Sequence, residues 1–469
     1  MAELSWRVKL VAERPSGVVT ETELACIERD AQISLAELGL TLAEAKQVTK
    51  ALQAEIVPAQ ITALGECPRA CEACRRRLAS KGYSAARFRS LFGDIPVRVR
   101  RLLVCPCQGT SESAAQSVAV LDFGRGAAVA PEFAYVTARY AALVPFGKTA
   151  DLLSELLPIS GPQHASTVRN RTLRVGKDVV QAHAAESVSQ PALPACGAVV
   201  VGIDGGYLRH RHRAEGCRFE VIAGKVIQAD GAQHRFAFTR TGTTATTEAF
   251  RAALAAVGVD ANTPATVLCD GDAGLWRLQR KVLPGAAVVL DWWHAAVRFE
   301  HALQAARSLG AGTAEASLAE RAVRALERAK WRLWHGRWPG CRRKLAALCR
   351  WAARRSVRDV AGVGKVHQHV VDLLGYLERN EAALVHYAAR RRRGEPIATS
   401  FVESAVDEII AWRMAKAQQM RWSRATVPAF LDVRTAVLND ALEDAFRRSH
   451  PGFRPQPAND DHRLTAVAA

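Results

Sequence analysis

The sequence lacks long apolar runs and has too few acidic residues to balance its basic ones. A membrane-spanning helix needs about 20 consecutive apolar residues, and the chain contains no run of even 18. Its first residues also lack the apolar stretch of a secretory signal peptide. We therefore expect a cytoplasmic protein without a membrane partner.

The shortage of acids leaves a large excess of positive charge. The 469 residues include 64 Lys and Arg but only 46 Asp and Glu, so the net charge is +18. Such an excess indicates a polyanionic partner, nucleic acid first, and a merely soluble Arg-rich surface is the alternative. With 49% apolar residues the chain is globular, and its length suits about three domains.

Eleven cysteines without a secretion signal are more typical of thiols or metal ligands than of disulfides. Four of them form two close pairs within residues 61–114. The pairs are Cys71 with Cys74 and Cys105 with Cys107. Such spacing favours a structural zinc site.

The stretch between the two pairs predicts a β-hairpin. Gly93 begins a Gly-Asp turn, and residues 97–100 alternate apolar with basic side chains. One face would then present Arg98 and Arg100 to DNA. Two cysteine pairs joined by a hairpin are the arrangement of a zinc ribbon. The Cys-x-Cys pair is tighter than usual, so Cys67 could replace one ligand, and unrelated thiols are the alternative.

Residues 1–60 are expected to form a helical N-terminal region, with helices that begin near Thr20, Leu35 and Thr41. Thr41 and Glu44 have the spacing of a capping box, in which each side chain satisfies a backbone N–H of the other residue. No chemistry is visible in this region.

Residues 115–192 have the outline of a helix-turn-helix. Helical spacing at 147–157 is broken at 158–161 and is followed by a basic helix that contains Arg169 and Arg171. We expect this region to bind DNA; an ordinary helical linker is the alternative.

Three short apolar runs between residues 195 and 298 are each followed directly by an acid. Runs of this length and β-branched content predict strands that are buried on both faces. Functional sites in open α/β sheets form at the carboxyl ends of such strands, and hard divalent cations bind oxygen ligands. The three acids are Asp204, Asp270 and Asp291.

The order of elements in this region points to an α/β fold. Three strands, a helix, a strand, a helix and a strand follow one another, which is the order of an RNase H-like core. A Pro-containing stretch at 190–194 precedes the core and is a plausible boundary.

Residues 299–395 are expected to form a basic helical insertion into the core. Trp331 and Arg332 exemplify its mixture of aromatic and basic side chains, which suits DNA because cations bind phosphates and rings stack on unpaired bases. A helical bundle with a tryptophan core is the alternative, and both can hold. A second basic run, either a phosphate contact or a solvated loop, consists of Arg390, Arg391, Arg392 and Arg393.

Residues 396–445 are expected to return to the core as helices, followed by a flexible tail at 446–469. Glu403 lies beside an apolar stripe with helical spacing, near the start of the helix. A capping role is the alternative for Glu403, and Asp407 and Glu408 are competing acids.

Together these segments resemble the DDE transposases of bacterial insertion sequences, specifically the ISKra-type group. The resemblance covers roughly residues 60–440, and the Cys-rich hairpin also fits that group. The matching strings are Gly202-Ile203-Asp204-Gly205, Cys269-Asp270-Gly271-Asp272, Leu290-Asp291-Trp292-Trp293-His294, Thr399-Ser400-Phe401-Val402-Glu403-Ser404 and Gln418-Gln419-Met420-Arg421-Trp422-Ser423.

The resemblance implies an acidic triad of Asp204, Asp270 and Glu403 that binds two Mg²⁺ or Mn²⁺ ions. Asp291 and His294 then correspond to the Asp-x-x-His element of related transposases. In that role Asp291 is a further possible metal ligand, and His294 contacts the scissile phosphate or orients the nucleophile. Without the resemblance, a helix-capping or core role is the alternative for His294.

The implied function is a transposase that binds element ends in double-stranded DNA, then cleaves and joins strands. We expect it to act as a homo-oligomer near the bacterial nucleoid. Asp272 is an alternative to Asp270, although the end of the strand favours Asp270, and Tyr207 keeps a covalent tyrosine mechanism as a minor alternative. Two other functions stay open: a catalytically silent, transposase-derived DNA-binding protein and an RNase H-like nuclease that joins nothing.

Overall fold

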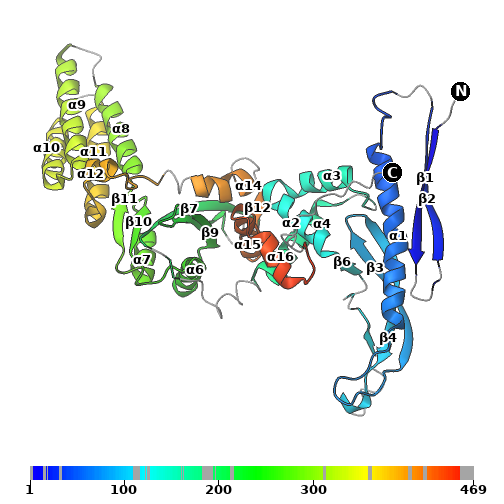
Figure 1. Ribbon diagram of the computed structural model, residues 1–469. Helices are drawn as coiled ribbons and strands as arrows, with labels where there is room; N and C mark the ends of the chain where they lie inside the picture. The colour runs from blue at the N-terminus through cyan, green and yellow to red at the C-terminus, as the bar shows by residue number, and fades with distance from the viewer. Residues whose placement is uncertain are drawn as a thin grey trace. The chain divides into compact units, whose positions relative to one another are not determined.

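The computed structural model divides the chain into two units, each built from both helices and strands (Figure 1). Unit 1 comprises residues 1–175 and 442–469, and unit 2 comprises residues 176–441. The described residues are 4–13, 17, 19–30, 34–108, 117–121, 123, 127–159, 161, 163–181, 194–195, 197–211, 216–309, 313–356, 362–399, 404–415 and 420–454.

The chain begins with an antiparallel hairpin, so the prediction of helices throughout residues 1–60 is wrong for this part. Strand β1 is Leu4–Glu13 and β2 is Val19–Arg29. Alternate residues of β1 are apolar, and Lys9 of β1 pairs with Glu21 of β2 at 2.5 Å. This period of two, together with cross-strand charge pairs, favours a strand over a helix.

Helix α1, Leu42–Glu66, begins at the predicted capping box, which is confirmed. The Glu44 N–H donates to Thr41 Oγ1 at 3.3 Å, and the Thr41 N–H donates to the Glu44 carboxylate at 2.9 Å. The same carboxylate pairs with Arg29 of β2 at 2.6 Å. The box therefore also attaches the helix to the hairpin.

We expect Glu44→Gln to reduce the loss of stability in acid. The hydrogen bond from Arg29, followed by those from Thr41, lowers the pKa of Glu44 from 4.5 to about 2. Because the folded pKa lies below the unfolded one, this contribution is present above the unfolded pKa and is lost as the pH falls toward 2. Unfolding midpoints measured from neutral to acid pH should fall less steeply in the variant. Parallel curves would show that the pair contributes nothing.

The second sheet of unit 1 confirms the predicted hairpin between the cysteine pairs. Val97 and Val99 of its second strand are buried in one core cluster with Val57 and Ile61 of α1, so the alternate residues face solvent. The strand order is β5-β4-β3-β6. The elements are β3 (Ser80–Ser90), β4 (Gly93–Leu103), η1 (Pro106–Gln108), β5 (Ser117–Ala119) and β6 (Ala127–Val129).

Four helices complete unit 1, and α3 and α4 confirm the helices predicted around the 158–161 break. The helices are α2 (Pro131–Leu143), α3 (Phe146–Leu156), α4 (Ala165–Val175) and α16 (Leu442–Ser449). The prediction of a flexible tail from residue 446 is wrong up to residue 454. Phe446 and Phe453 are buried, and each ring lies 5.4 Å from that of Tyr135 on α2. Residues 455–469 lie outside the described residues.

Unit 2 contains a mixed sheet in the order β11-β10-β7-β8-β9, with β12 beside β7. Strands β8 and β9 run antiparallel in succession, whereas β10 and β11 run parallel to β7. The strands and their helices are β7 (Val199–His210), β8 (Arg218–Ile227), β9 (Gln233–Thr239), α6 (Thr243–Ala255), β10 (Ala265–Cys269), α7 (Ala273–Val282), β11 (Ala287–Leu290) and β12 (Arg421–Trp422).

A bundle of helices follows β11, as predicted for residues 299–395 (Figure 1). Its buried apolar residues form one core with those of the sheet. The bundle consists of α8 (Trp292–Arg307), α9 (Thr313–Trp334), α10 (Trp338–Ser356), α11 (Val363–Arg379), η5 (Glu381–Ala383) and α12 (Tyr387–Arg392). None of the helices in the described residues is long and apolar enough to cross a bilayer.

Further helical segments of unit 2, from its beginning and its end, pack on one another. They are η3 (Gly176–Gln181), η6 (Asp407–Ala411), α14 (Trp412–Met414) and α15 (Val427–Leu438). A Cβ atom on Gly176 would lie 2.1 Å from the Ala429 carbonyl oxygen, so only glycine allows η3 to approach α15 this closely.

Candidate functional site

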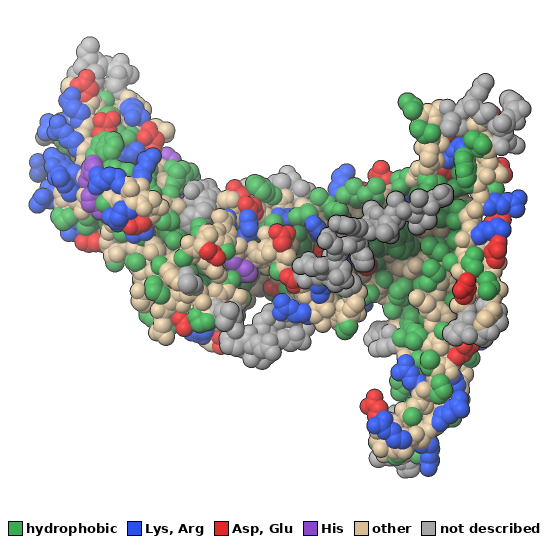
Figure 2. Space-filling view, viewed as in Figure 1, with side chains coloured by type: hydrophobic (Ala, Val, Ile, Leu, Met, Phe, Trp, Pro, Cys, Tyr) green, Lys and Arg blue, Asp and Glu red, His purple; other side chains and the backbone are tan. Residues whose placement is uncertain are grey.

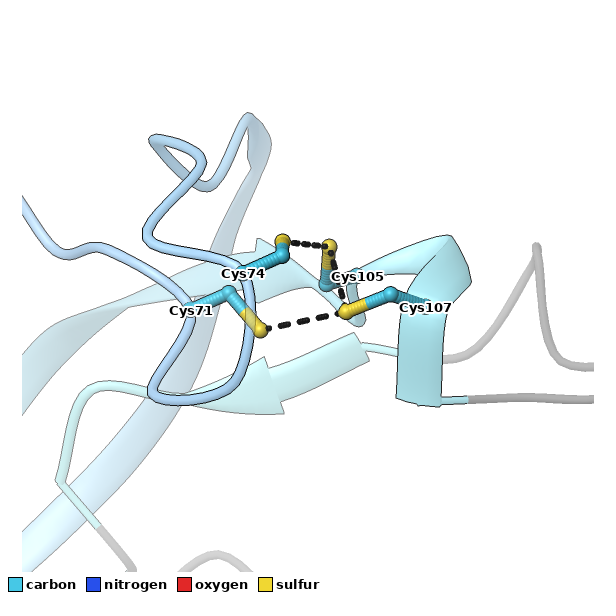
Figure 3. Close-up of side chains that lie close together, drawn as sticks. All are labelled: Cys71, Cys74, Cys105 and Cys107. Carbon is cyan, nitrogen blue, oxygen red and sulfur yellow. Dashed lines mark hydrogen bonds between the residues drawn. The ribbon is translucent and has the colours of Figure 1, made fainter.

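Four cysteine thiols meet in unit 1 (Figure 3). One pair lies in the loop before β3, and the other follows β4. All four sulfur atoms lie within 4.8 Å of one another. Sulfur–sulfur distances of 3.4 Å join Cys71 to Cys107, Cys74 to Cys105, and Cys105 to Cys107. The two pairs that the sequence singled out therefore lie together in space.

This geometry fits a tetrahedral metal site. Four sulfur ligands about 2.3 Å from a zinc ion lie roughly 3.8 Å apart, whereas a disulfide bond is about 2.05 Å long. Cys71 and Cys105 are buried, and Cys74 and Cys107 are exposed. The group could therefore hold a structural metal such as zinc. Cys67 is exposed and lies outside the group.

The loop that carries the first pair stabilises thiolates, which are the form that binds metals. The backbone N–H of Cys74 lowers the pKa of Cys71 to about 7. The backbone N–H of Arg76 lowers the pKa of Cys74. The loop is closed by the Arg75 N–H, which donates to the Cys71 carbonyl at 2.9 Å. The backbone of Arg75 is in the left-handed region, with φ 59°.

In unit 2, Asp204 and Asp270 lie at one level of two neighbouring parallel strands. Gly202 of β7 pairs with Leu268 of β10. Each aspartate lies two residues further along its chain, so this register, continued by two residues, brings Asp204 opposite Asp270. Adjacent strands lie about 4.8 Å apart. The expectation that Asp204 ends its strand is wrong, because β7 continues to His210 through its pairing with β8.

Asp291 lies at the same level on the next strand. Cys269 pairs with Leu290, and the Asp291 N–H donates to the Cys269 carbonyl at 3.0 Å. Asp204 lies within β7, whereas Asp270 and Asp291 directly follow the last residues of β10 and β11, so the register of the strands, continued past their ends, places the three aspartates in a row. In the described part of the chain, however, the cysteines alone form a group of three or more ligands close enough for one ion.

Asp272 is engaged at the start of α7. Its Oδ1 accepts from the N–H groups of Gly274 at 2.8 Å and Leu275 at 2.9 Å. Between the two acids, Gly271 has φ +96°, and a Cβ there would lie 2.9 Å from Tyr376. Asp270 Oδ1 in turn accepts from the Asp272 N–H at 2.9 Å, so both acids take part in the turn before α7.

Asp291 is also engaged in local structure. It is 1% exposed and is the N-cap of α8, where it accepts from the Trp293 N–H at 2.6 Å. Its other oxygen accepts from the hydroxyl of buried Thr399. His294 Nε2 lies 3.8 Å from that same oxygen. Asp291 thus anchors both the start of α8 and residue 399, with His294 close by.

Glu403 lies outside the described residues, as do residues 400–402. On one side of this gap, Thr399 bonds to Asp291. On the other side, Val406 and Ile410 lie against Gly206 of β7, where a Cβ atom would be 2.6 Å from Ile410 Cδ1. Of the competing acids, Glu408 pairs with Arg235 at 2.5 Å and accepts from Ser404 at 3.0 Å.

Two residues that the sequence did not suggest clamp the ends of β10 and β11, and a third, Asn380, connects the helical bundle to α7. Tyr376 of α11 donates its hydroxyl to the Asp270 carbonyl at 2.7 Å, and Tyr387 of α12 donates to the Leu290 carbonyl at 2.9 Å. Asn380 accepts from the Trp276 indole at 2.7 Å. The tyrosine partners are 106 and 97 residues apart in sequence, so no local pattern could reveal them.

We expect Tyr376→Phe to destabilise unit 2 by about 1–3 kcal/mol, because the Asp270 carbonyl loses its donor in a partly buried place. Burial raises the pKa of Tyr376, so its hydroxyl remains a donor across the working pH range. Denaturant unfolding measures the effect. Tyr207→Phe is the matched control, since Tyr207 is 61% exposed and should change stability by less than about 0.5 kcal/mol. Equal effects would argue against the clamp.

The arginines expected to bind DNA from the hairpin of unit 1 differ in exposure. Arg98 is exposed, with its guanidinium 5.3 Å from the centre of the Tyr83 ring. Arg100 is half-buried and donates to the Gly65 carbonyl and to Ser80 Oγ. Arg98 is therefore the more accessible of the two.

On α4, Arg169 is half-buried and Arg171 is only 9% exposed. Arg171 donates to Thr137 Oγ1 at 3.1 Å, and its guanidinium lies 4.0 Å from the centre of the Phe133 ring. Arg171 thus belongs to the wall of a pocket rather than to an open surface.

Lys and Arg side chains gather over α9 and α10 (Figure 2). On the same helices, Trp331 is 61% exposed and Trp338 is buried. The ring centre of Trp334 lies 4.8 Å from that of Trp292. Trp334 and Trp338 therefore take part in the packing of the bundle, whereas Trp331 is left exposed. Arg332 is half-buried. In the second basic run, Arg390 pairs with Glu395, and the exposed members are Arg391, Arg392 and Arg393.

Comparison with known proteins found no protein-family model and no curated sequence that matches the chain.

Proposed function

We propose that this protein is a DDE-type transposase, which binds element ends and catalyses metal-dependent DNA cleavage and strand transfer. The observation that carries the proposal is the row of Asp204, Asp270 and Asp291 across three parallel strands. Carboxylates at one level of adjacent strands suit two hard cations and a phosphodiester.

The topology of unit 2 supports an RNase H-like core. Its first strand is central, two antiparallel strands extend the sheet on one side, and two parallel strands extend it on the other. The order of elements along the chain, three strands, a helix, a strand, a helix and a strand, is the one that the sequence predicted. The helices of residues 292–392 are then an insertion between the third aspartate and the final acid.

The described residues on either side of Glu403 support its assignment to the triad. Thr399, four residues before it, is bonded to Asp291. Val406, three residues after it, lies against Gly206, which is two residues beyond Asp204. Glu408, in contrast, is held by Arg235.

In this proposal each side chain has a distinct task. Bound Mg²⁺ or Mn²⁺ would polarise the phosphate and make water a better nucleophile. Asp204, on the central strand, lies beside Asp270 and can share an ion with it. His294, fixed near Asp291, is placed to orient the DNA strand. Tyr376 and Tyr387 act as positioning residues, because they hold the strand ends from which Asp270 and Asp291 project.

The remaining features fit recognition of DNA. The basic surface of α9 and α10 provides phosphate contacts, and exposed Trp331 can stack on an unpaired base. The four-cysteine group with its hairpin suits a zinc ribbon that presents Arg98. We place the protein at the nucleoid of a bacterial cytoplasm, acting as a homo-oligomer on paired ends.

The direct test uses the purified protein and duplexes that carry the DNA flanking its own gene on each side. Nicking at a fixed position that needs Mg²⁺ or Mn²⁺, followed by joining to a target duplex, is the expected result. Cleavage without joining would favour an RNase H-like nuclease. Binding without cleavage in either metal would favour a catalytically silent DNA-binding protein.

A further inference from the structure

Unit 1 contains a polar pocket of about 180 Å³ between the turn of the β3–β4 hairpin and the helices α2 and α4. Its walls include Arg89 of β3, Arg171 of α4, Gln163 and Thr167. A water molecule occupies about 30 Å³ in the liquid, so the pocket is large enough for a small polar ligand.

Arg171 is the unusual feature of this pocket. It is 91% buried, and no carboxylate in the described residues pairs with it. Its protein contacts are the Thr137 hydroxyl and the face of Phe133. Burial, together with the nearby Arg89 and Arg174, lowers the pKa of Arg171 to about 10, which still leaves it charged at neutral pH. A buried charge of this kind is costly without a counterion.

The other polar groups of the pocket suit an anion. Arg89 adds a second positive charge. The acid in the wall, Asp94, pairs through Oδ2 with Arg87 at 3.1 Å and with Arg89 at 3.7 Å, so these three side chains together keep one positive charge. Gln163 Oε1 is buried without a hydrogen-bond partner, and rotation of the amide would turn its NH₂ group toward a ligand.

We propose that this pocket binds a phosphate group, held by Arg171 and Arg89 with Gln163 and Thr167 as hydrogen-bond donors. Arginine forks match the oxygen geometry of phosphate. The phosphate belongs either to a nucleic-acid backbone or to a free phosphate ion. The site is separate from the row of aspartates, so it stands or falls independently of the proposed transposase activity.

Inorganic phosphate and the full-length protein provide the test. Calorimetry should show saturable phosphate binding beyond a chloride control of equal ionic strength. Gln163→Glu should weaken that binding about tenfold or more, because a carboxylate replaces a donor to the anion. This variant keeps Arg171 and gives it a counterion, so we expect it to fold with at least wild-type thermal stability.

Arg174→Gln is the matched control. It removes one positive charge from the same helix, but Arg174 is exposed and does not line the pocket. Phosphate affinity should change by less than about twofold, since only a screened charge is lost. Absence of saturable binding, or equal affinity in wild type and Gln163→Glu, would overturn the proposal.

A second arm identifies the source of the phosphate. A mixed-sequence duplex is added to the phosphate complex in the same buffer. The pocket is assigned to a DNA backbone phosphate if the duplex displaces phosphate and if Arg171→Met reduces the salt dependence of DNA binding. This dependence is the slope of the logarithm of the binding constant against the logarithm of the salt concentration, and its magnitude should fall by about one. Retention of phosphate alongside bound DNA assigns it to the free ion. Either result requires the binding seen in the first arm.

Discussion

Asp204→Asn is expected to slow DNA cleavage about a thousandfold or more while leaving DNA affinity unchanged. The substitution keeps the shape of the side chain but removes the charge that would hold a divalent ion, and such stabilisation is worth several kcal/mol. Asp270→Asn should behave in the same way, because its residue lies opposite Asp204. Single-turnover cleavage of the flanking-DNA duplex in Mg²⁺ gives the rate, and gel shifts without metal give the affinity.

Asp272→Asn is the control for this experiment. It removes an equal charge two residues from Asp270, but asparagine caps a helix as well as aspartate does, so α7 keeps its start. We expect a rate within a fewfold of wild type. Cleavage that persists in Asp204→Asn would place the active site elsewhere. Loss of cleavage in Asp272→Asn with activity kept in Asp270→Asn would exchange the roles of these two acids.

Replacing Cys105 with serine is expected to release the metal from unit 1 and to unfold the loops around it. Cys105 is buried and lies 3.4 Å from the sulfur atoms of both Cys74 and Cys107. Binding of a structural zinc ion contributes about 10–16 kcal/mol to the folding of small zinc domains. Mutation of a residue that is hydrogen-bonded to a metal ligand weakens metal binding roughly 10–100-fold, so loss of a ligand itself should weaken zinc binding by more than that. Elemental analysis of protein purified without chelator, combined with chelator competition, measures this.

Cys67→Ser is the matched control, because Cys67 is exposed and outside the four-cysteine group. It should keep one zinc per chain and wild-type stability. Wild-type protein that carries no zinc would reduce the group to four neighbouring thiols. Zinc loss in Cys67→Ser but not in Cys105→Ser would bring Cys67 back as a ligand.

Much of the local structure could be predicted because it depends on residues close together in sequence. The Thr41–Glu44 capping box, the hairpin around Gly93 and the apolar strands of unit 2 follow from spacing and periodicity alone. The expectation of a helix from Thr20 is wrong because Thr-Glu repeats suit both a helix start and a strand. Pairing with β1, a tertiary contact, decided between the two.

Contacts between distant residues were beyond sequence reasoning. Periodicity identifies an apolar face of a helix, but it does not say which basic residue is buried beside that face. Arg169 and Arg171 looked equivalent in sequence, yet packing of α4 against α2 buries Arg171 against Phe133. Likewise, the clamp by Tyr376 exists only because the helical bundle packs back onto the ends of the strands.

The amino-acid sequence was enough to identify the residues that can bind ions or take part in chemistry. They are two cysteine pairs, three acids that follow or interrupt buried strands, and the side chains of a strongly basic helical segment. Composition and spacing specify these because they are properties of single residues and near neighbours. The tertiary structure alone decided that the thiols converge, that the aspartates share one level, and that Asp272 and Glu408 are committed to a helix cap and an ion pair. Strand register and helix docking fix those relations, and both depend on burial of apolar surface between segments far apart in the chain.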